Sequence, residues 1–216
     1  AFRGADLAFR AAPAAAAREW APRARAEGCR AVVDASAAFR ADPGVPLVVA
    51  KVNPGALAGF SEGIAAGPEA AALLLATALE PLRRAAGLER VAAATLHAAS
   101  GSGEAAVREL EAEVADLMNG REPDPPIESP HRSAFNLVPH LGAFGEGGRT
   151  DEEPRTADEV RRVPGEPGPR LAGASAGGAV VFAHTQPVWR GTRRRLPAGG
   201  GRGGVAPGGG LEVGRR

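Results

Sequence analysis

Short apolar runs alternate with longer helical stretches through the first half of the chain. Four runs are short enough to be strands: residues 5–9, 31–33, 47–49 and 64–66. Residues 14–26 have the composition of a helix between the first two runs, and Gly28 marks its end. A helix that joins two strands is typical of a parallel crossover. We therefore predict a mainly parallel sheet and an α/β fold class.

An alanine- and leucine-rich segment at residues 69–86 predicts a buried helix. Pro81 lies inside this segment, and because proline removes a backbone donor we expect it to kink or split the helix. Gly87 is a typical stop signal, and residues 91–96 have the pattern of a strand. A helix and a strand are therefore expected on either side of Gly87.

The clearest helix covers residues 104–118. Its apolar side chains recur at i, i+3, i+7 and i+10, namely Val107, Leu110, Val114 and Leu117. A tight turn at residues 99–103 precedes the helix, and a proline-rich loop at residues 122–126 follows it. The helix is therefore expected to begin and end sharply.

The last third of the chain has weaker patterns. Residues 151–162 predict a charged helix, and residues 171–184 predict one or two strands. The glycines at 173, 177 and 178 weaken the strand prediction, because glycine has no side chain to pack.

Composition excludes several classes of protein. The only cysteine, Cys29, can form neither an internal disulfide nor a cysteine zinc cage, and the four histidines lack close ligand spacing. We therefore predict no metal site. No apolar run approaches the roughly 18 residues of a membrane span, and residues 1–6 lack a signal pattern. The prediction is a cytoplasmic protein with no membrane partner.

The charge of the chain is unevenly distributed. The formal net charge is +1, but residues 191–216 carry six arginines against one glutamate, which leaves −4 for residues 1–190. The same tail contains ten glycines and is expected to be disordered. Its single Arg202-Gly203-Gly204 triplet is weak support for RNA binding, so we predict no nucleic-acid partner.

Several separate motifs occur in one order along the chain. They are Val32–Pro43, Val45–Val49, Val52-Asn53-Pro54, Ala99–Gly103, Asn119-Gly120, Ala134–His140 and His184. Together they resemble the aspartate-semialdehyde dehydrogenase family over about residues 5–190. The resemblance implies NADP-dependent reductive dephosphorylation of 4-phospho-L-aspartate to L-aspartate 4-semialdehyde. That reaction lies on the route to lysine, threonine and methionine.

The resemblance also implies a domain organisation. It predicts a partial Rossmann-type NADP-binding domain at residues 1–69 and an α+β catalytic and dimerisation domain at residues 70–190. Residues 191–216 form the predicted Gly/Arg-rich tail. The family's glycine-rich phosphate loop would lie before Ala1, and its last strands and helix after Arg216.

The family's nucleophile is a cysteine at the start of a helix, where its pKa is lowered and it can form a thioester. The corresponding turn here is Gly67-Pro68-Glu69-Ala70-Ala71, so Ala70 stands at the nucleophile position. Alanine has no group that can attack. We expect Cys29 to be a small buried residue and not a substitute. The resemblance therefore predicts a chain that is inactive as it stands.

Other family positions are partly retained. The resemblance makes His184 the general base, Arg40 and Arg162 phosphate-binding residues, and Glu159 a partner of the substrate amine. His97 replaces a substrate-orienting glutamine, and Gly177 replaces a carboxylate-binding arginine. Ser100 and Gly101 match a cofactor-binding backbone turn. Without the resemblance, the sequence around Arg40 predicts only a surface charge. Glu159 and Arg162 would be an i, i+3 pair on a helix, and His184 a histidine in an apolar segment.

Several functions remain open from the sequence. The chain could be an enzyme that binds NADP and a small-molecule substrate, or a non-catalytic homologue that forms a homodimer or a heterodimer with an active relative. A third possibility is a decaying or misassembled reading frame with no selected role, which would also explain the altered site. A more distant alternative is a reductase of N-acetylglutamyl phosphate, which shares the thioester chemistry. These alternatives make different predictions about enzyme turnover, about association with a second chain and about folding.

Overall fold

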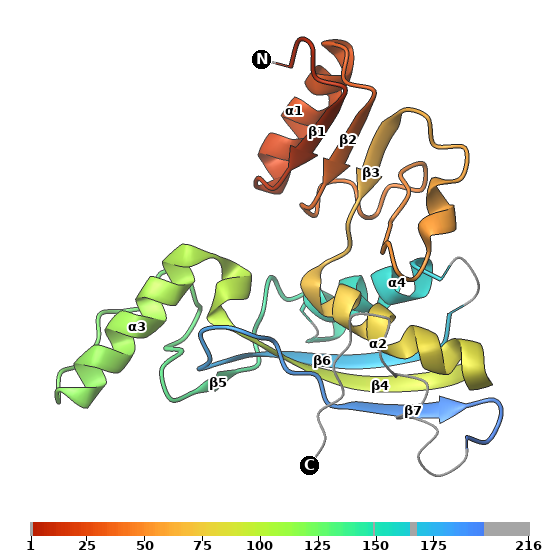
Figure 1. Ribbon diagram of the computed structural model, residues 1–216. Helices are drawn as coiled ribbons and strands as arrows, with labels where there is room; N and C mark the ends of the chain where they lie inside the picture. Colours follow the sequence, from red (N-terminus) through yellow and green to blue (C-terminus); the bar gives the residue numbers. More distant parts are fainter. Residues whose placement is uncertain (1, 149, 165–167, 197–216) are drawn as a thin grey trace. The chain divides into compact units, whose positions relative to one another are not determined.

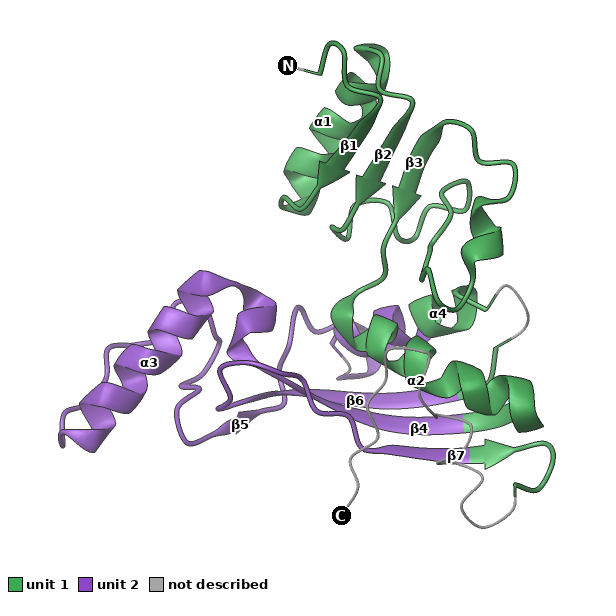
Figure 2. Cartoon of the chain, viewed as in Figure 1, with its two compact units in different colours: residues 1–90, 158–170, 191–216 green, residues 91–157, 171–190 purple. Residues whose placement is uncertain are grey.

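The computed structural model describes residues 2–148, 150–164 and 168–196. The chain divides into two compact units, which Figure 2 shows in different colours. Unit 1 comprises residues 1–90, 158–170 and 191–216, and unit 2 comprises residues 91–157 and 171–190. The predicted division into domains at residues 69 and 190 remains a prediction.

Unit 1 begins with a three-stranded parallel sheet of order β1-β2-β3 (Figure 1). Its strands are β1 (Leu7–Arg10), β2 (Ala31–Asp34) and β3 (Gly63–Ala66). Helix α1 (Ala14–Ala26) connects β1 to β2 and covers one face of this sheet. The predicted parallel sheet and its crossover helix are confirmed.

The core of this sheet is built from small side chains. Ala17, Ala21 and Ala24 form the fully buried stripe of α1, which allows the helix backbone to lie close to the strands. Val32 and Cys29 are also fully buried in this cluster. The prediction that Cys29 is a small buried residue is confirmed.

The expected strand at residues 47–49 does not form. Only Leu47 makes an isolated parallel bridge, with Ala66. The side chain of Asn53 forms hydrogen bonds with backbone groups of this segment. Its Nδ2 donates to Leu47 O at 2.9 Å, and its Oδ1 accepts from Val49 N at 2.7 Å. A side chain therefore replaces a strand partner here, and a short 3₁₀ helix at Pro54–Leu57 follows.

Helix α2 (Ala70–Ala86) runs without a break through Pro81. The expected split does not occur, because buried residues on both sides of the proline, including Leu75 and Leu82, anchor the two halves. Proline costs the helix one backbone hydrogen bond, which this packing offsets. Gly87 ends the helix at a φ of 66°, which glycine adopts without strain.

A buried carboxylate lies near the end of α2. Glu80 is 6% exposed and accepts hydrogen bonds from Arg83 Nε and Arg84 Nε, both at 2.6 Å. Burial raises the pKa of Glu80, but these two hydrogen bonds outweigh it and hold the pKa below its ordinary value. The ionised form of Glu80 is thus favoured in the folded protein.

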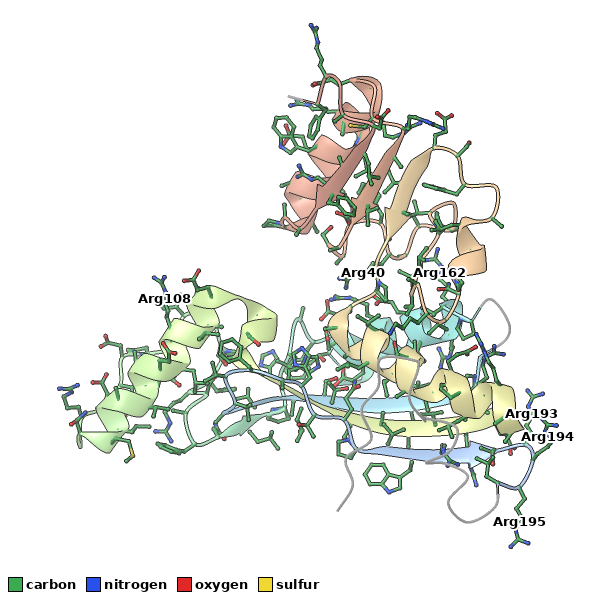
Figure 3. The ribbon with its side chains drawn as sticks, in the orientation of Figure 1. Arg40, Arg108, Arg162, Arg193, Arg194 and Arg195 are labelled. Atoms are coloured by element: carbon green, nitrogen blue, oxygen red, sulfur yellow. The ribbon has the colours of Figure 1, made fainter. Side chains whose placement is uncertain are left out.

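The chain returns to the end of α2 after its last strand. The backbone N–H groups of Arg193 and Arg194 donate to Gly87 O at 3.1 Å and Ala86 O at 2.9 Å. Figure 3 labels these two arginines. They satisfy carbonyl groups that the helix leaves open. The Arg202-Gly203-Gly204 triplet and the rest of the predicted tail from residue 197 lie outside the described residues.

The second sheet has four strands in the order β5-β6-β4-β7. They are β4 (Leu88–His97), β5 (Leu137–Val138), β6 (Arg170–Gly178) and β7 (Val188–Thr192). Strand β6 covers the first part of the segment 171–184 that was predicted to form one or two strands, in spite of its glycines. Near its end, β6 pairs antiparallel with β5, with Leu137 opposite Gly178.

Helix α3 (Glu104–Met118) of unit 2 has the bounds predicted from its apolar spacing. It follows a 3₁₀ turn at Ala99–Ser102. Two of its glutamates bind the following loop through backbone N–H groups. Glu109 accepts from residues 127, 128 and 129, and the buried Glu113 accepts from residues 133 and 134 at 2.9 and 2.8 Å. The loop is therefore fixed to the helix.

The charged helix predicted at 151–162 is α4 (Glu152–Arg162), which follows a 3₁₀ turn at Glu146–Gly148. Asp151, Glu152 and Arg155 form an i, i+3 and i, i+4 ion-pair set at its start. Among the described residues, no helix is both long and apolar enough to cross a bilayer.

Candidate functional site

The predicted site residues fall into two groups, one in each unit. Unit 1 holds Arg40, Ala70, Glu159 and Arg162, and unit 2 holds His97, Ser100, Gly101 and His184. The structure brings the members of each group together, as the following contacts show. Figure 3 labels Arg40 and Arg162, which come from the loop after β2 and from the end of α4.

The nucleophile position lies at the start of a long helix. Ala70 is the first residue of α2, and its side chain is exposed. The N–H of the preceding residue, Glu69, donates to Glu159 Oε2 at 2.6 Å. The positive end of the α2 dipole thus already contacts one carboxylate. This helix end therefore has an anionic partner within unit 1, and residue 70 offers no sulfur to attack an acyl group.

Arg40 is committed to partners within unit 1. Its guanidinium donates to Gly67 O at 3.0 Å and to Ala35 O at 2.7 Å, and Nη1 lies 3.6 Å from Glu159 Oε1. The Arg40 and Glu159 side chains are 12% and 5% exposed. Because both charges are buried, removing either one would leave the other uncompensated. Arg40 is therefore not the surface charge that its sequence context alone suggested.

Arg162 binds backbone oxygens. Its guanidinium donates to the carbonyl oxygens of Arg40, Asp42 and Val45, the last two at 2.7 and 2.9 Å. A planar guanidinium with several donors suits such a set of acceptors. Arg162 therefore fixes the loop after β2, and a phosphate would have to compete with three carbonyl groups for it.

The carboxyl ends of the parallel strands carry a small polar cluster. Asp34, the last residue of β2, is fully buried, and its Oδ2 accepts from Ser36 Oγ at 2.7 Å. Ser36 Oγ in turn accepts from Ala38 N at 3.1 Å. Ligands of open parallel sheets bind at this edge. The cluster shapes the loop that contains Arg40 and was not singled out from the sequence.

His184 in unit 2 is held by the turn after β4. Its Nδ1 accepts from the backbone N–H of Ala98 at 3.0 Å. Gly101 lies against the ring: a Cβ at this position would be 2.7 Å from His184 Cε1. Gly101 is therefore required for the imidazole to occupy this position. The structure places Gly101 and His184 together, with Ser100 in the same turn.

His97 lies between His184 and an acidic side chain. The rings of His97 and His184 have centroids 4.9 Å apart, and His97 Nε2 lies 3.7 Å from Glu152 Oε1. Glu152 was missed in the sequence, because it stands 55 positions from His97 and no local pattern joins them. A protonated His97 would form an ion pair with Glu152, which the neutral glutamine of the family could not.

Comparison with known proteins places these residues in a family. A family model described as semialdehyde dehydrogenase, NAD binding domain, matches residues 1–60, and one described as semialdehyde dehydrogenase, dimerisation domain, matches residues 79–197. The second match covers more than half of the chain. The chain belongs to the semialdehyde dehydrogenase family. This confirms the resemblance and the fold class predicted from the sequence motifs.

Individual relatives agree with this family. The aspartate-semialdehyde dehydrogenase of Aquifex aeolicus is 33% identical over 196 residues, which are 90% of this chain and 57% of that protein. The Bacillus subtilis enzyme is 31% identical over 194 residues, or 87% of this chain and 56% of that protein. The chain thus spans somewhat more than half the length of these curated relatives.

Solved structures show the same fold. Aspartate-semialdehyde dehydrogenase II of Vibrio cholerae superposes with a TM-score of 0.87 at 30% identity, covering 92% of this chain and 59% of that one. A probable aspartate-semialdehyde dehydrogenase of Pseudomonas aeruginosa has a TM-score of 0.85 at 28% identity, covering 95% and 61%. The α/β architecture is therefore that of the family.

Proposed function

We propose that this chain descends from aspartate-semialdehyde dehydrogenases, which reduce 4-phospho-L-aspartate to L-aspartate 4-semialdehyde with NADPH. The support is sequence identity of about 33% to enzymes of that name over nine-tenths of the chain. The match to an NAD-binding domain supports a nicotinamide cofactor, and NADP is the form we propose. The substrate would be a small molecule, in cytoplasmic synthesis of lysine, threonine and methionine.

We further propose that the chain does not turn over, and the observation that carries this is Ala70 at the first residue of α2. The reaction needs a thiolate there to form the thioester. Cys29 cannot take its place, since it is 0% exposed in the core of unit 1. Loss of a covalent nucleophile costs about a million-fold in turnover.

Within each unit, the retained residues would still contact ligands. Glu159, with its carboxylate at the start of α2, would contact the substrate amine, although it already pairs with Arg40. Arg40 and Arg162 would supply positive charge for phosphate. Ser100 and Gly101 would contact the cofactor, and His97 and His184 would face the reacting group.

An activity assay tests this proposal. Phosphate-dependent reduction of NADP by the semialdehyde, measured at high protein concentration, is expected to give no signal above the blank. Turnover by the unmodified chain would overturn the proposed inactivity. The same assay with acetylglutamyl semialdehyde tests the distant alternative, and turnover there alone would reassign the substrate. Quenching of Trp20 and Trp189 fluorescence by NADP measures cofactor binding separately.

A second candidate function is that of a non-catalytic dimerising homologue. Unit 2 exposes many large apolar side chains: Met118, Ile127, Phe135, Leu137, Phe144, Val180, Phe182 and Trp189. Exposed apolar groups in this number favour a surface that another protein covers. The matched dimerisation domain points to a second copy or an active relative. Sedimentation that shows only monomers, alone and beside an active relative, would contradict this.

A further inference from the structure

The hydrogen bond between Ala98 and His184 fixes the protonation pattern of the imidazole. A backbone N–H can only donate, so the Nδ1 atom that it contacts at 3.0 Å must carry a lone pair. A neutral imidazole has one N–H and one lone pair. The proton of neutral His184 must therefore be on Nε2.

Ring rotation does not remove this constraint. A half-turn of the ring would place Cδ2 against the Ala98 amide, which is then left without an acceptor. Ala98 is 2% exposed, so water cannot easily take the place of Nδ1. A buried donor without a partner is strongly disfavoured. The observed ring orientation is thus also set by the Ala98 amide.

The surrounding backbone holds both partners in place. Ala99 N and Ser100 N donate to Val180 O and Val181 O at 2.9 and 3.0 Å. Ala183, directly before His184, has a φ of 71°, a left-handed conformation that alanine rarely adopts. Such strain persists only where neighbouring contacts enforce it, and it is common at functional sites.

We propose that the Ala98 amide makes neutral His184 a hydrogen-bond donor at Nε2. The general-base role implied by the family resemblance requires a lone pair on the free nitrogen, and this tautomer has none there. Full protonation would turn Nδ1–H against the Ala98 N–H and break their hydrogen bond. A neutral imidazole N–H at Nε2 suits a hydrogen bond to an acceptor oxygen of a bound ligand. The oxygen's identity rests on the proposed function, whereas the tautomer does not.

Nitrogen NMR of the histidine-labelled protein tests the proposal. At about pH 8.5, where an ordinary histidine is neutral, one ring is expected to show an unprotonated Nδ1 and a protonated Nε2 with at least tenfold preference. That ring must disappear from the spectrum of His184→Gln and remain in His131→Gln. A mixture of tautomers, or a protonated Nδ1, for His184 would overturn the proposal.

Removal of the amide provides a second test. Ala98 has a φ of −79°, which suits proline, and Ala98→Pro keeps the carbonyl group that accepts from Gly101 N at 2.9 Å. The proline Cδ replaces the hydrogen that points at Nδ1, so the substitution removes the donor and also displaces the imidazole from it. The variant is expected to lose the tenfold preference, and Ala98→Gly, which keeps the N–H, is expected to retain it. An unchanged tautomer in a folded Ala98→Pro would contradict the inference. If that variant does not fold, the unmodified protein's spectrum still decides. No substrate is present, so either result leaves the proposed function to its own assay.

Discussion

The start of α2 should activate a thiol that is put back at position 70. Ala70 is exposed and opens a 17-residue helix, so the side chain of Ala70→Cys would lie at the positive end of the helix dipole. The Glu159 carboxylate also lies at this helix end, but its charge is paired with Arg40 and so only partly opposes the dipole. A thiolate there is therefore stabilised relative to the thiol. We expect the pKa of this cysteine to lie below that of an ordinary exposed cysteine.

The size of the effect follows from the helix terminus. A negative charge at an exposed helix N-terminus gains about 0.5–1 kcal/mol, which corresponds to roughly 0.4–0.7 pKa units below about 8.5. At about pH 7.5 the thiolate fraction would rise from roughly a tenth to roughly a quarter. Since a less basic thiolate is a somewhat weaker nucleophile, the alkylation rate should rise about twofold.

Alkylation by iodoacetamide, followed by mass spectrometry across pH, measures this rate. Cys29 is fully buried and should stay unmodified in the native protein, so it serves as an internal control. Ala58→Cys is the matched control, because Ala58 is exposed in a turn away from any α-helix start. Equal or slower alkylation of Ala70→Cys would refute the reasoning from the helix terminus.

Three further substitutions test individual contacts. The pKa of Glu80 is lowered on folding, so the ionised carboxylate stabilises the folded protein above about pH 4.5. This contribution is lost as the pH falls below 4.5 and through the lower folded pKa. Over that pH range the urea midpoint of the native chain should fall, and that of Glu80→Gln should fall much less. Gly142→Ala has a φ of 77° and meets only the end of the flexible Asp151 side chain, which can turn away. Its loss of stability should therefore be close to that of Gly120→Ala, which has a similar φ of 69° and open space; thermal unfolding compares the two, and a clearly larger loss for Gly142→Ala would contradict this. Glu113→Ala leaves two backbone N–H groups without their acceptor. Chemical denaturation should show a loss of about 2–4 kcal/mol in the free energy of unfolding. A loss below about 1 kcal/mol would count against a stabilising role of this contact.

Local patterns predicted the helices and most strands of this chain. Helix 104–118 was predicted with its observed bounds, because its apolar spacing and flanking glycines agree. Residues 47–49 have the composition of a strand, yet the Asn53 side chain takes their hydrogen bonds. Pro81 is tolerated because of tertiary packing. Neither effect can be read from a local window.

The candidate site was predictable only through family motifs. His184 and Gly101 stand 83 positions apart, and without the resemblance no sequence pattern joins them. The role of Ala98 could not be predicted at all, since its contribution is a backbone N–H that any residue except proline supplies. Glu152 was missed for a similar reason, because its contact with His97 is made only by folding.

The glutamate clamp between α3 and the loop at 127–134 has a consequence for sequence variation. Five loop positions, 127, 128, 129, 133 and 134, must keep an N–H, while their side chains are unconstrained by the clamp. The prolines of this region, at 123, 125, 126 and 130, avoid all five. Apart from the fully buried Ala134, these positions can therefore change residue type while the path of the loop stays the same, provided that proline never enters those five places.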